Sequence, residues 1–191
     1  SVSEALSSLN STSGDIIKSQ LQFAVYEQGI GWLGSLKSLK PGAGYMLNAA
    51  NVGTLTYPNE GLANGRTYAN NGEIESQWSY NSVAYGNNMT VIAELELEEN
   101  TGLENGYLIG AFVGDDIRGI AEPIYINENK SYRYFLTIGG QQSGDSISFK
   151  VIDPYNQVRN IVSEKIIYKS NSSVGSIDNP FELELDQPST I

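Results

Sequence analysis

The segment MTVIAELELEEN (residues 89–100) alternates apolar and acidic side chains at successive positions. The apolar members are Val91, Ala93, Leu95 and Leu97, and the acidic members are Glu94, Glu96 and Glu98. Because successive side chains of a strand point to opposite faces, this pattern predicts a strand with one buried and one solvated face. FELEL (181–185) repeats the pattern near the end of the chain, so both segments are expected in a sheet that covers a core.

Further β-rich runs are spaced regularly between these two segments. We expect strands at 106–113, 116–127, 131–138, 145–152, near 157–169 and at 181–185. The turns between them, GDD, NENK, GGQQSGD and DPYN, carry the residues that β-turns favour. About seven short strands at this spacing are typical of an antiparallel β-sandwich, of the immunoglobulin-like or jelly-roll-like kind. We assign this domain to residues 86–187.

The N-terminal part predicts a small β-module over residues 1–60. A short helix is expected over 2–9, where Val2, Leu6 and Leu9 share one face and Ser3 could cap the start. Strands are expected at 16–29, 32–36, 45–47 and 53–57. The segment 61–85 is rich in Asn, Gly and Ser and is interpreted as a linker or long loop. The fold class is therefore mainly β with one short helix.

The stretch GWLGSLKSLKPGAGYML (31–47) allows two interpretations. In the first, a glycine-rich loop exposes Trp32 and Tyr45 to a ligand. In the second, Pro41, Gly42 and Gly44 form turns and the two aromatic residues belong to the core. Proline presets the backbone for a turn, and glycine readily adopts positive φ, so the second interpretation is favoured.

The composition excludes several kinds of chemistry. Cys and His are both absent, which excludes thiol nucleophiles, imidazole-dependent triads, disulfides and zinc sites with thiolate or imidazole ligands. The net charge of −11 disfavours nucleic acid and anionic membrane surfaces, since both require cationic patches. No apolar run approaches the roughly 20 residues that span a bilayer. We expect neither a nucleic-acid partner nor membrane insertion.

Catalysis by paired carboxylates is also not expected. A glycosidase needs two carboxyl groups about 5–10 Å apart across a cleft. With 22 acidic residues, some pair will meet this distance by chance. Most of these residues alternate along strands, as on a solvated surface. We therefore predict no catalytic residues and no enzyme activity; the opposite conclusion would require a cleft lined by two carboxylates with separated pKa values.

Trp78, Tyr80 and Tyr85 form the densest aromatic group, in QWSYNSVAYGNN (77–88). Tyr and Trp combine an apolar face with a polar group, which suits stacking on sugar rings and hydrogen bonding to hydroxyls. Together with Trp32 and Tyr45 they are the candidate ligand-binding residues. The alternative is structural: the group anchors the start of the second domain against the sandwich.

Four acidic residues, Asp115, Asp116, Glu122 and Asp145, are candidate calcium ligands. Calcium takes six to eight oxygen ligands, and carboxylates in neighbouring loops could supply some of them. The spacing of an EF-hand is absent, and Asp-Asp in a β-turn is common turn chemistry. Arg118 is close enough in sequence to pair with Asp116 or another acid. Calcium is the only cofactor that the sequence suggests.

The two halves resemble known β-modules in sequence. The pattern G-D-x-I-K-x-Q, F-A-x-Y and G-W-x-G-S-L-x-x-L-x-P-G-x-G-Y (14–45), followed by GTLTYP, is similar to a small module of large secreted proteins from Bacteroidetes-type bacteria. MTVIAELEL, YLIGAFVGDDIRG, YFLTIGG, SGDSISFKVID and VGSIDNPFELEL resemble the module that often follows it. The resemblance implies an accessory part of an exported enzyme or adhesin that uses type IX secretion. It also implies an N-terminally truncated first module, because a strand normally precedes the helix.

These observations together predict a non-catalytic accessory module that is secreted or displayed on a bacterial surface. Its expected ligand is a polysaccharide or surface glycan, bound by aromatic and amide groups, and its other partners are further domains of the parent polypeptide. The alternative is a structural spacer or adhesin segment that makes protein or cell-surface contacts. Exposed side chains at 78, 80 and 85 would favour glycan binding, and buried ones would favour the spacer.

Overall fold

The computed structural model describes residues 1–57, 78–81, 84–97, 106–162 and 165–185. Its elements are α1 (Val2–Ala5), β1 (Ile16–Lys18), β2 (Phe23–Glu27), β3 (Gly31–Gly34), β4 (Met46–Asn48), β5 (Asn87–Glu96), β6 (Leu108–Val113), β7 (Asp116–Ala121), β8 (Pro123–Ile126), β9 (Ser131–Gly140), β10 (Ser146–Ile152), β11 (Val158–Asn160), β12 (Ile166–Ile167), β13 (Ser173–Val174) and β14 (Phe181–Glu184). The predicted fold class, mainly β with one short helix, is confirmed.

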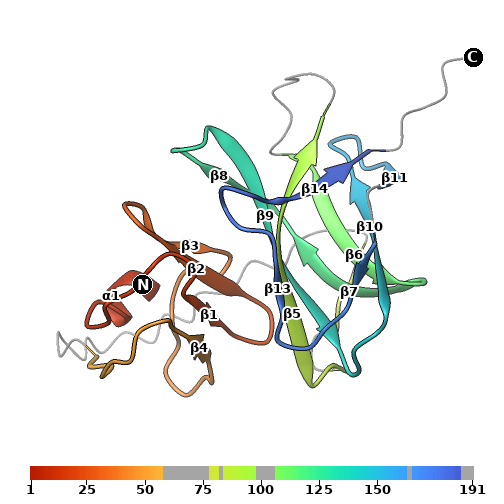
Figure 1. Ribbon diagram of the computed structural model, residues 1–191. Helices are drawn as coiled ribbons and strands as arrows, with labels where there is room; N and C mark the ends of the chain where they lie inside the picture. Colours follow the sequence, from red (N-terminus) through yellow and green to blue (C-terminus); the bar gives the residue numbers. More distant parts are fainter. Residues whose placement is uncertain (58–77, 82–83, 98–105, 163–164, 186–191) are drawn as a thin grey trace, which may run out of the picture.

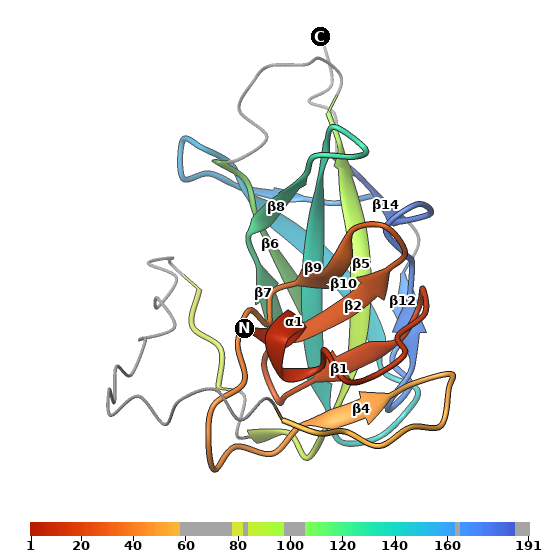
Figure 2. The same cartoon turned by 90° about the vertical axis from the view of Figure 1, so that its left-hand side faces the viewer.

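The strands form three sheets that lie one behind another (Figure 1). The N-terminal sheet has the order β3-β2-β1-β4, with α1 on its outer side. The middle sheet has the order β13-β5-β9-β8, and β14 also pairs with β5. The far sheet has the order β11-β10-β6-β7, and β12 also pairs with β10. Figure 2 shows the N-terminal sheet in front of β5 and β9.

The sandwich core lies between the middle and far sheets. The predicted alternation accounts for it, because Val91 and Ala93 on β5 face inward and are fully buried. The other completely buried members are Met89, Ile109, Ala111, Leu136, Ile138, Ile147, Val151 and Leu183. Leu183 lies on β14, whose sequence FELEL carries the second alternating pattern. These side chains join the two sheets into one apolar layer.

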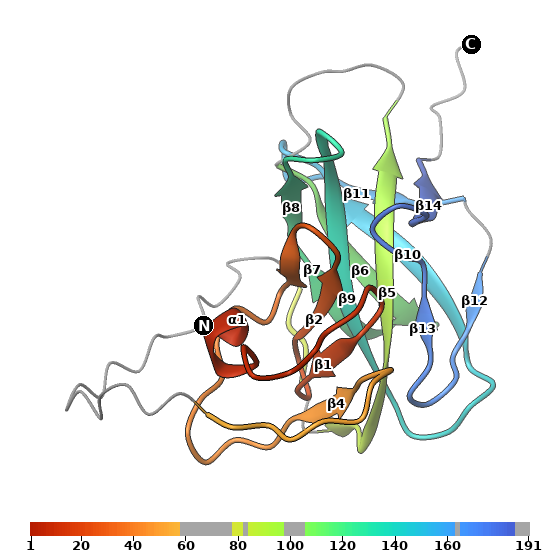
Figure 3. The ribbon, with the colours of Figure 1, turned by 60° about the vertical axis from the view of Figure 1, so that its left-hand side comes forward.

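The sheets are not entirely antiparallel, which corrects one part of the predicted sandwich. Both β13 and β14 run parallel to β5 and pair with successive stretches of its length (Figure 3). Phe181 lies opposite Ala93, and Glu184 lies opposite Glu96. Side-chain alternation fixes which face of a strand is buried, but it is the same for both strand directions. The parallel pairing was therefore not accessible from the pattern.

Several predicted N-terminal elements differ from the observed ones. The expected strand 16–29 is a hairpin, β1 and β2, whose turn is closed by hydrogen bonds to the Ser19 hydroxyl. The helix is shorter than expected and is capped by Ser1, which forms a capping box with Glu4, so Ser3 is not the cap. The stretch 53–57 contains no strand. The short polar turn at Ser19 explains why the first expected strand divides in two.

The predicted strand 116–127 crosses from one sheet to the other. It divides at Glu122 into β7, which pairs with β6 in the far sheet, and β8, which pairs with β9 in the middle sheet. The strand passes so close to β9 that a Cβ atom on Gly119 would lie 2.4 Å from the Thr137 carbonyl oxygen. Glycine is therefore required at this close approach of β7 to β9.

A second apolar layer joins the N-terminal sheet to the outer face of the middle sheet; we call it the seam. Its buried residues are Phe23, Ile92, Ile126, Phe135 and Ile177. The rings of Phe23 and Phe135 meet at a centroid distance of 5.5 Å. Since Phe23 comes from β2 and Phe135 from β9, the predicted boundary between the two domains is spanned by a continuous core.

Polar contacts extend the seam. The Lys18 ammonium donates to the Asn171 side-chain oxygen at 3.1 Å and to the Asn88 carbonyl at 3.5 Å. The Asn88 amide in turn donates to the carbonyls of Ser19 and Gln20. Lys18 is buried, and burial lowers the pKa of its ammonium group. The two halves thus share hydrogen bonds as well as apolar contacts.

Candidate functional site

Trp78 lies on the outer face of the far sheet. Its ring meets the Phe112 ring edge to face at a centroid distance of 5.3 Å. A Cβ atom on Gly110 would come within 2.7 Å of the indole, so Trp78 fills the space above a strand residue that has no side chain. Phe112 is only 5% exposed. Trp78 thus anchors its segment on the sheet, in agreement with the structural interpretation.

Tyr80 and Tyr85 lie together over the end of β9. Their rings are nearly parallel, with an interplanar angle of 12° and a centroid distance of 6.2 Å. Both approach Gly139, where an added Cβ atom would lie 2.7 Å from the Tyr85 ring. Both tyrosines are half-buried. The structure therefore brings two of the predicted ligand-binding residues together, over a glycine that makes room for them.

The Tyr80 hydroxyl is buried against the backbone of Gly139. It has no hydrogen-bond partner of normal geometry among the described residues. Burial raises the pKa of Tyr80 to about 12, and the neighbouring Tyr85 adds to the effect. Burial also raises the pKa of Tyr85, as does the hydrogen bond from its hydroxyl to Asp116. Neither phenol is therefore ionised at neutral pH.

Arg118 occupies a β-bulge in the hairpin of β6 and β7. Ala111 lies opposite Gly119, but the next residue, Phe112, lies opposite Ile117. Arg118 is thus the extra residue of β7 that has no partner in the ladder. A bulge bends the strand and changes the direction of the side chain that it carries.

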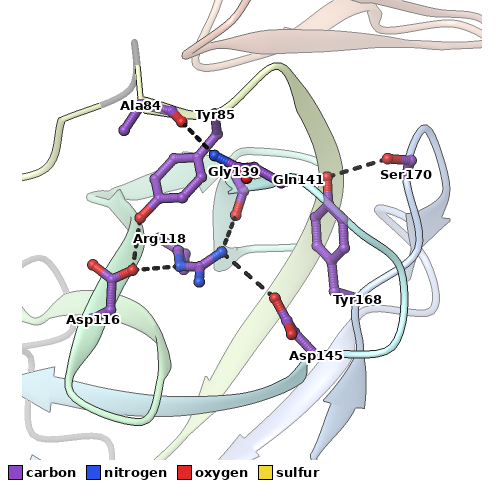
Figure 4. Close-up of polar contacts among 9 residues, drawn as sticks. All are labelled: Ala84, Tyr85, Asp116, Arg118, Gly139, Gln141, Asp145, Tyr168 and Ser170. Carbon is purple, nitrogen blue, oxygen red and sulfur yellow. Dashed lines mark hydrogen bonds and ion pairs between the residues drawn. The ribbon is translucent and has the colours of Figure 1, made fainter.

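The Arg118 guanidinium joins three separate segments, as Figure 4 shows. Its Nε lies 2.8 Å from an Asp116 carboxylate oxygen, as the sequence suggested. Its Nη1 lies 3.7 Å from an Asp145 oxygen and donates to the Gly139 carbonyl at 3.4 Å. Its Cζ atom lies 4.5 Å from the centre of the Tyr85 ring, a cation–π distance.

Tyr85 completes this group, because its hydroxyl donates to the same Asp116 oxygen at 2.7 Å. We call Tyr85, Asp116, Arg118 and Asp145 the Tyr85–Arg118 cluster (Figure 4). The side chain of Arg118 is only 13% exposed, whereas those of Asp116 and Asp145 are 56% and 40% exposed. The cluster therefore presents two carboxylates to solvent, with the cation behind them.

Two glutamine side chains fix the segment that carries Tyr85. The Gln141 amide donates to the Ala84 carbonyl at 3.2 Å, and the Gln20 amide donates to the Tyr85 carbonyl. Gln20 belongs to the N-terminal half and Gln141 follows β9. The position of Tyr85 is thus set by both halves of the chain.

Trp32 and Tyr45 are not part of this site. Both are partly buried and pack against the small N-terminal core beside α1. Trp32 also meets the Tyr26 ring edge to face at 5.6 Å, and the Tyr45 hydroxyl accepts a hydrogen bond from the Lys40 backbone. This packing agrees with the second interpretation of the glycine-rich stretch. Gly42 has the expected positive φ, whereas Gly44 does not.

The four predicted calcium ligands do not form one site. Among the described residues, no group of three or more acidic side chains could hold a metal ion. Asp116 and Asp145 both pair with Arg118, while Asp115 and Glu122 are exposed and, within the described part of the chain, form no ion pair with Arg118. The guanidinium thus provides the positive charge that the sequence analysis assigned to calcium.

The sequence analysis named the four members of the cluster separately but missed the residues around which they assemble. Gly139 and Gln141 stand in GGQQSGD, which reads only as a turn, and the bulge at Arg118 leaves no signal in the sequence. The one clue was DDIRG, in which an arginine closely follows two acids. The proximity of Arg118 to Tyr85 and Asp145 depends on how β7, β9 and β10 are arranged in space.

The comparisons with known proteins add no family. No protein-family model matches the chain, and neither the curated proteins nor the solved structures give a match. The described helical residues include no segment long and apolar enough to cross a bilayer. The resemblance to secreted bacterial modules therefore stays a prediction.

Proposed function

We propose that this chain is a non-catalytic accessory module of a secreted bacterial multidomain protein, and that it acts as a rigid spacer between other domains. The observation that carries this proposal is the seam. Phe23 and Phe135 are 0% and 2% exposed, although they belong to different predicted domains. A spacer that transmits a fixed distance needs such a continuous core, because domains joined only by a linker move independently.

The placement of the aromatic residues supports the same proposal. Trp78 packs on Gly110 and Phe112, and the Tyr80 hydroxyl is buried against Gly139. Side chains used in this way stabilise the docking of their own segment. The spacer, which was the alternative in the sequence analysis, is thus favoured over a role in which all three aromatics form an open platform.

Carbohydrate binding is the second candidate function, and one observation favours it. Tyr85 is only half-buried and stands beside the exposed carboxylates of Asp116 and Asp145. A partly open aromatic ring next to hydrogen-bonding groups suits a neutral sugar. The spacer and glycan binding are compatible, because the seam and this surface use different residues.

The spacer proposal is tested by backbone ¹⁵N relaxation of the whole chain. We expect residues 1–57 and 84–185 to give the same rotational correlation time. Phe135→Ala should separate the two values, since it removes the centre of the seam. Tyr155→Ala, at a residue that is 75% exposed, is the matched control and should change nothing. Two different correlation times in the unmodified chain would overturn the proposal.

A further inference from the structure

The exposed surface of the Tyr85–Arg118 cluster has the chemistry of a hydroxyl-binding site. The exposed Asp116 and Asp145 carboxylates accept hydrogen bonds, and the N–H groups of the Arg118 guanidinium behind them, whose side chain is 13% exposed, donate them. A sugar hydroxyl can both donate and accept. Two hydroxyls on adjacent carbons can therefore bond to a carboxylate and to the neighbouring guanidinium at the same time.

The aromatic part of the cluster lies directly beside these polar groups. The Tyr85 hydroxyl is held by Asp116, and Gln20 and Gln141 fix the backbone on either side of the ring. Side chains that are already held in place lose little conformational entropy when a ligand binds to them. Tyr85 faces Tyr80 and the Arg118 guanidinium, so a pyranose whose hydroxyls reach the carboxylates meets a preformed polar group and not a free stacking platform.

The charge of the cluster limits the class of ligand. Two carboxylates and one guanidinium give the cluster a net charge of −1, on a chain whose net charge is −11. Uronic or sulfated sugars would be repelled, so the ligand should be neutral. Because the guanidinium already bridges both carboxylates, a divalent cation is not needed to hold them together.

We infer that the Tyr85–Arg118 cluster binds vicinal diols of neutral polysaccharides without calcium. This inference rests on carbohydrate binding, the second candidate function. It adds to that candidate the position of the site, the chemical group that is recognised and the independence from metal.

Affinity electrophoresis with three neutral polysaccharides tests this inference. Dextran and mannan carry vicinal diols along the chain, whereas the internal residues of laminarin do not. We expect dextran or mannan to retard the protein and laminarin to leave it unaffected. Brief periodate oxidation, which cleaves vicinal diols, should abolish the retardation, and EDTA should not change it.

Two variants locate the site. Asp145→Asn keeps the shape of the side chain but removes its charge, and Arg118→Lys keeps the charge but removes the paired N–H groups. Loss of a charge-assisted hydrogen bond should raise Kd at least about tenfold in each. Glu128→Gln, at an exposed turn residue, is the control and should bind normally. Thermal unfolding verifies that each variant is folded.

The outcomes distinguish this inference from the candidate function. If none of the three polysaccharides retards the protein, both the inference and carbohydrate binding at this site are wrong. If a polysaccharide binds but Asp145→Asn has no effect, binding occurs elsewhere and only the inference is overturned. Equal binding of laminarin, or loss of binding in EDTA, would also overturn it.

Discussion

At the scale of single residues, two features give direct predictions: the buried phenol of Tyr80 and the glycine that contacts the backbone of a neighbouring strand. Both depend on atoms that are distant in sequence. Tyr80 is perturbed by burial over β9, and Gly34 is constrained by Phe23 on β2. Each can be tested with a conservative substitution and a matched control.

The pKa of Tyr80, raised from 10.0 to about 12, predicts a loss of stability at alkaline pH. Folding favours the protonated phenol, so its contribution is complete below about pH 10 and is lost as the pH rises toward about 12. In urea unfolding at about pH 8 and about pH 11, the decrease in unfolding free energy should be smaller in Tyr80→Phe than in the parent. Tyr155→Phe is the control. An equal decrease in Tyr80→Phe and the parent would contradict the prediction.

The surroundings of Gly34 indicate that adding one methyl group there should strongly lower the unfolding free energy. A Cβ atom there would lie 2.2 Å from the Phe23 carbonyl oxygen, and the φ of 150° is also unfavourable for other residues. Gly34→Ala should therefore lower the unfolding free energy by at least about 2 kcal/mol in urea titrations. Gly44→Ala, which would meet no atom within 4 Å, should change it by less than about 0.5 kcal/mol. Similar effects for the two would rule out this explanation.

At the scale of elements, the parallel pair of β5 and β14 aligns like charges. Glu182 lies opposite Glu94, and Glu184 lies opposite Glu96. Arg133 contacts Glu94 at 2.8 Å and offsets part of the repulsion. The alternating pattern that reveals each strand in the sequence thus creates an acidic surface once the two strands pair. Pairing in this register is maintained by the apolar side chains on the opposite face.

Glu182→Lys should stabilise this pair of strands. It replaces a like-charge contact with an attractive one opposite Glu94, and such cross-strand pairs contribute about 0.2–1 kcal/mol. The gain should appear in urea unfolding at low salt and shrink at about 1 M NaCl, where charges are screened. Glu128→Lys makes the same change of charge in an exposed turn and should give a smaller gain. If the two variants are equal, the effect comes from net charge and not from the strand pair.

At the scale of the whole molecule, the seam should make the two halves unfold as one unit. Phe135 is 2% exposed and contacts Phe23 across the seam. Phe135→Ala should lower the unfolding free energy by about 3–5 kcal/mol. Hydrogen exchange of this variant should show reduced amide protection in β1 and β2 as well as in β9. Tyr155→Ala should have little effect on either. Protection lost in β9 alone would mean that the halves are energetically independent.

The whole-molecule arrangement also decides the availability of the candidate residues. Trp32 and Tyr45 pack against the N-terminal core, and Trp78 packs on the far sheet. Of the predicted ligand-binding group, Tyr85 stands beside exposed carboxylates. The surface available for recognition is therefore smaller than the aromatic content of the sequence suggested, and it includes an arginine that the sequence analysis considered only as a surface partner.

The sequence by itself determined the local properties of this protein. Alternation of side chains predicted β5 and β14 and their core-facing residues, although the other face of β5, expected in solvent, is buried at Thr90 and Ile92. Turn residues predicted most hairpins, and the absence of Cys and His excluded whole classes of chemistry. These features depend on neighbours within a few residues, so they can be read without a fold. The tight turn at Gly42 is another example.

Only the tertiary structure decided which distant segments meet. The tertiary structure pairs β13 and β14 with β5 in the parallel direction. It also buries Lys18 and Phe135, which come from opposite halves of the chain, at the seam. A one-residue bulge turned Arg118 toward Tyr85 and Asp145. Contacts of this kind depend on register and on the order of strands in each sheet. The alternating pattern is the same for every register that keeps its apolar face buried, and therefore could not specify them.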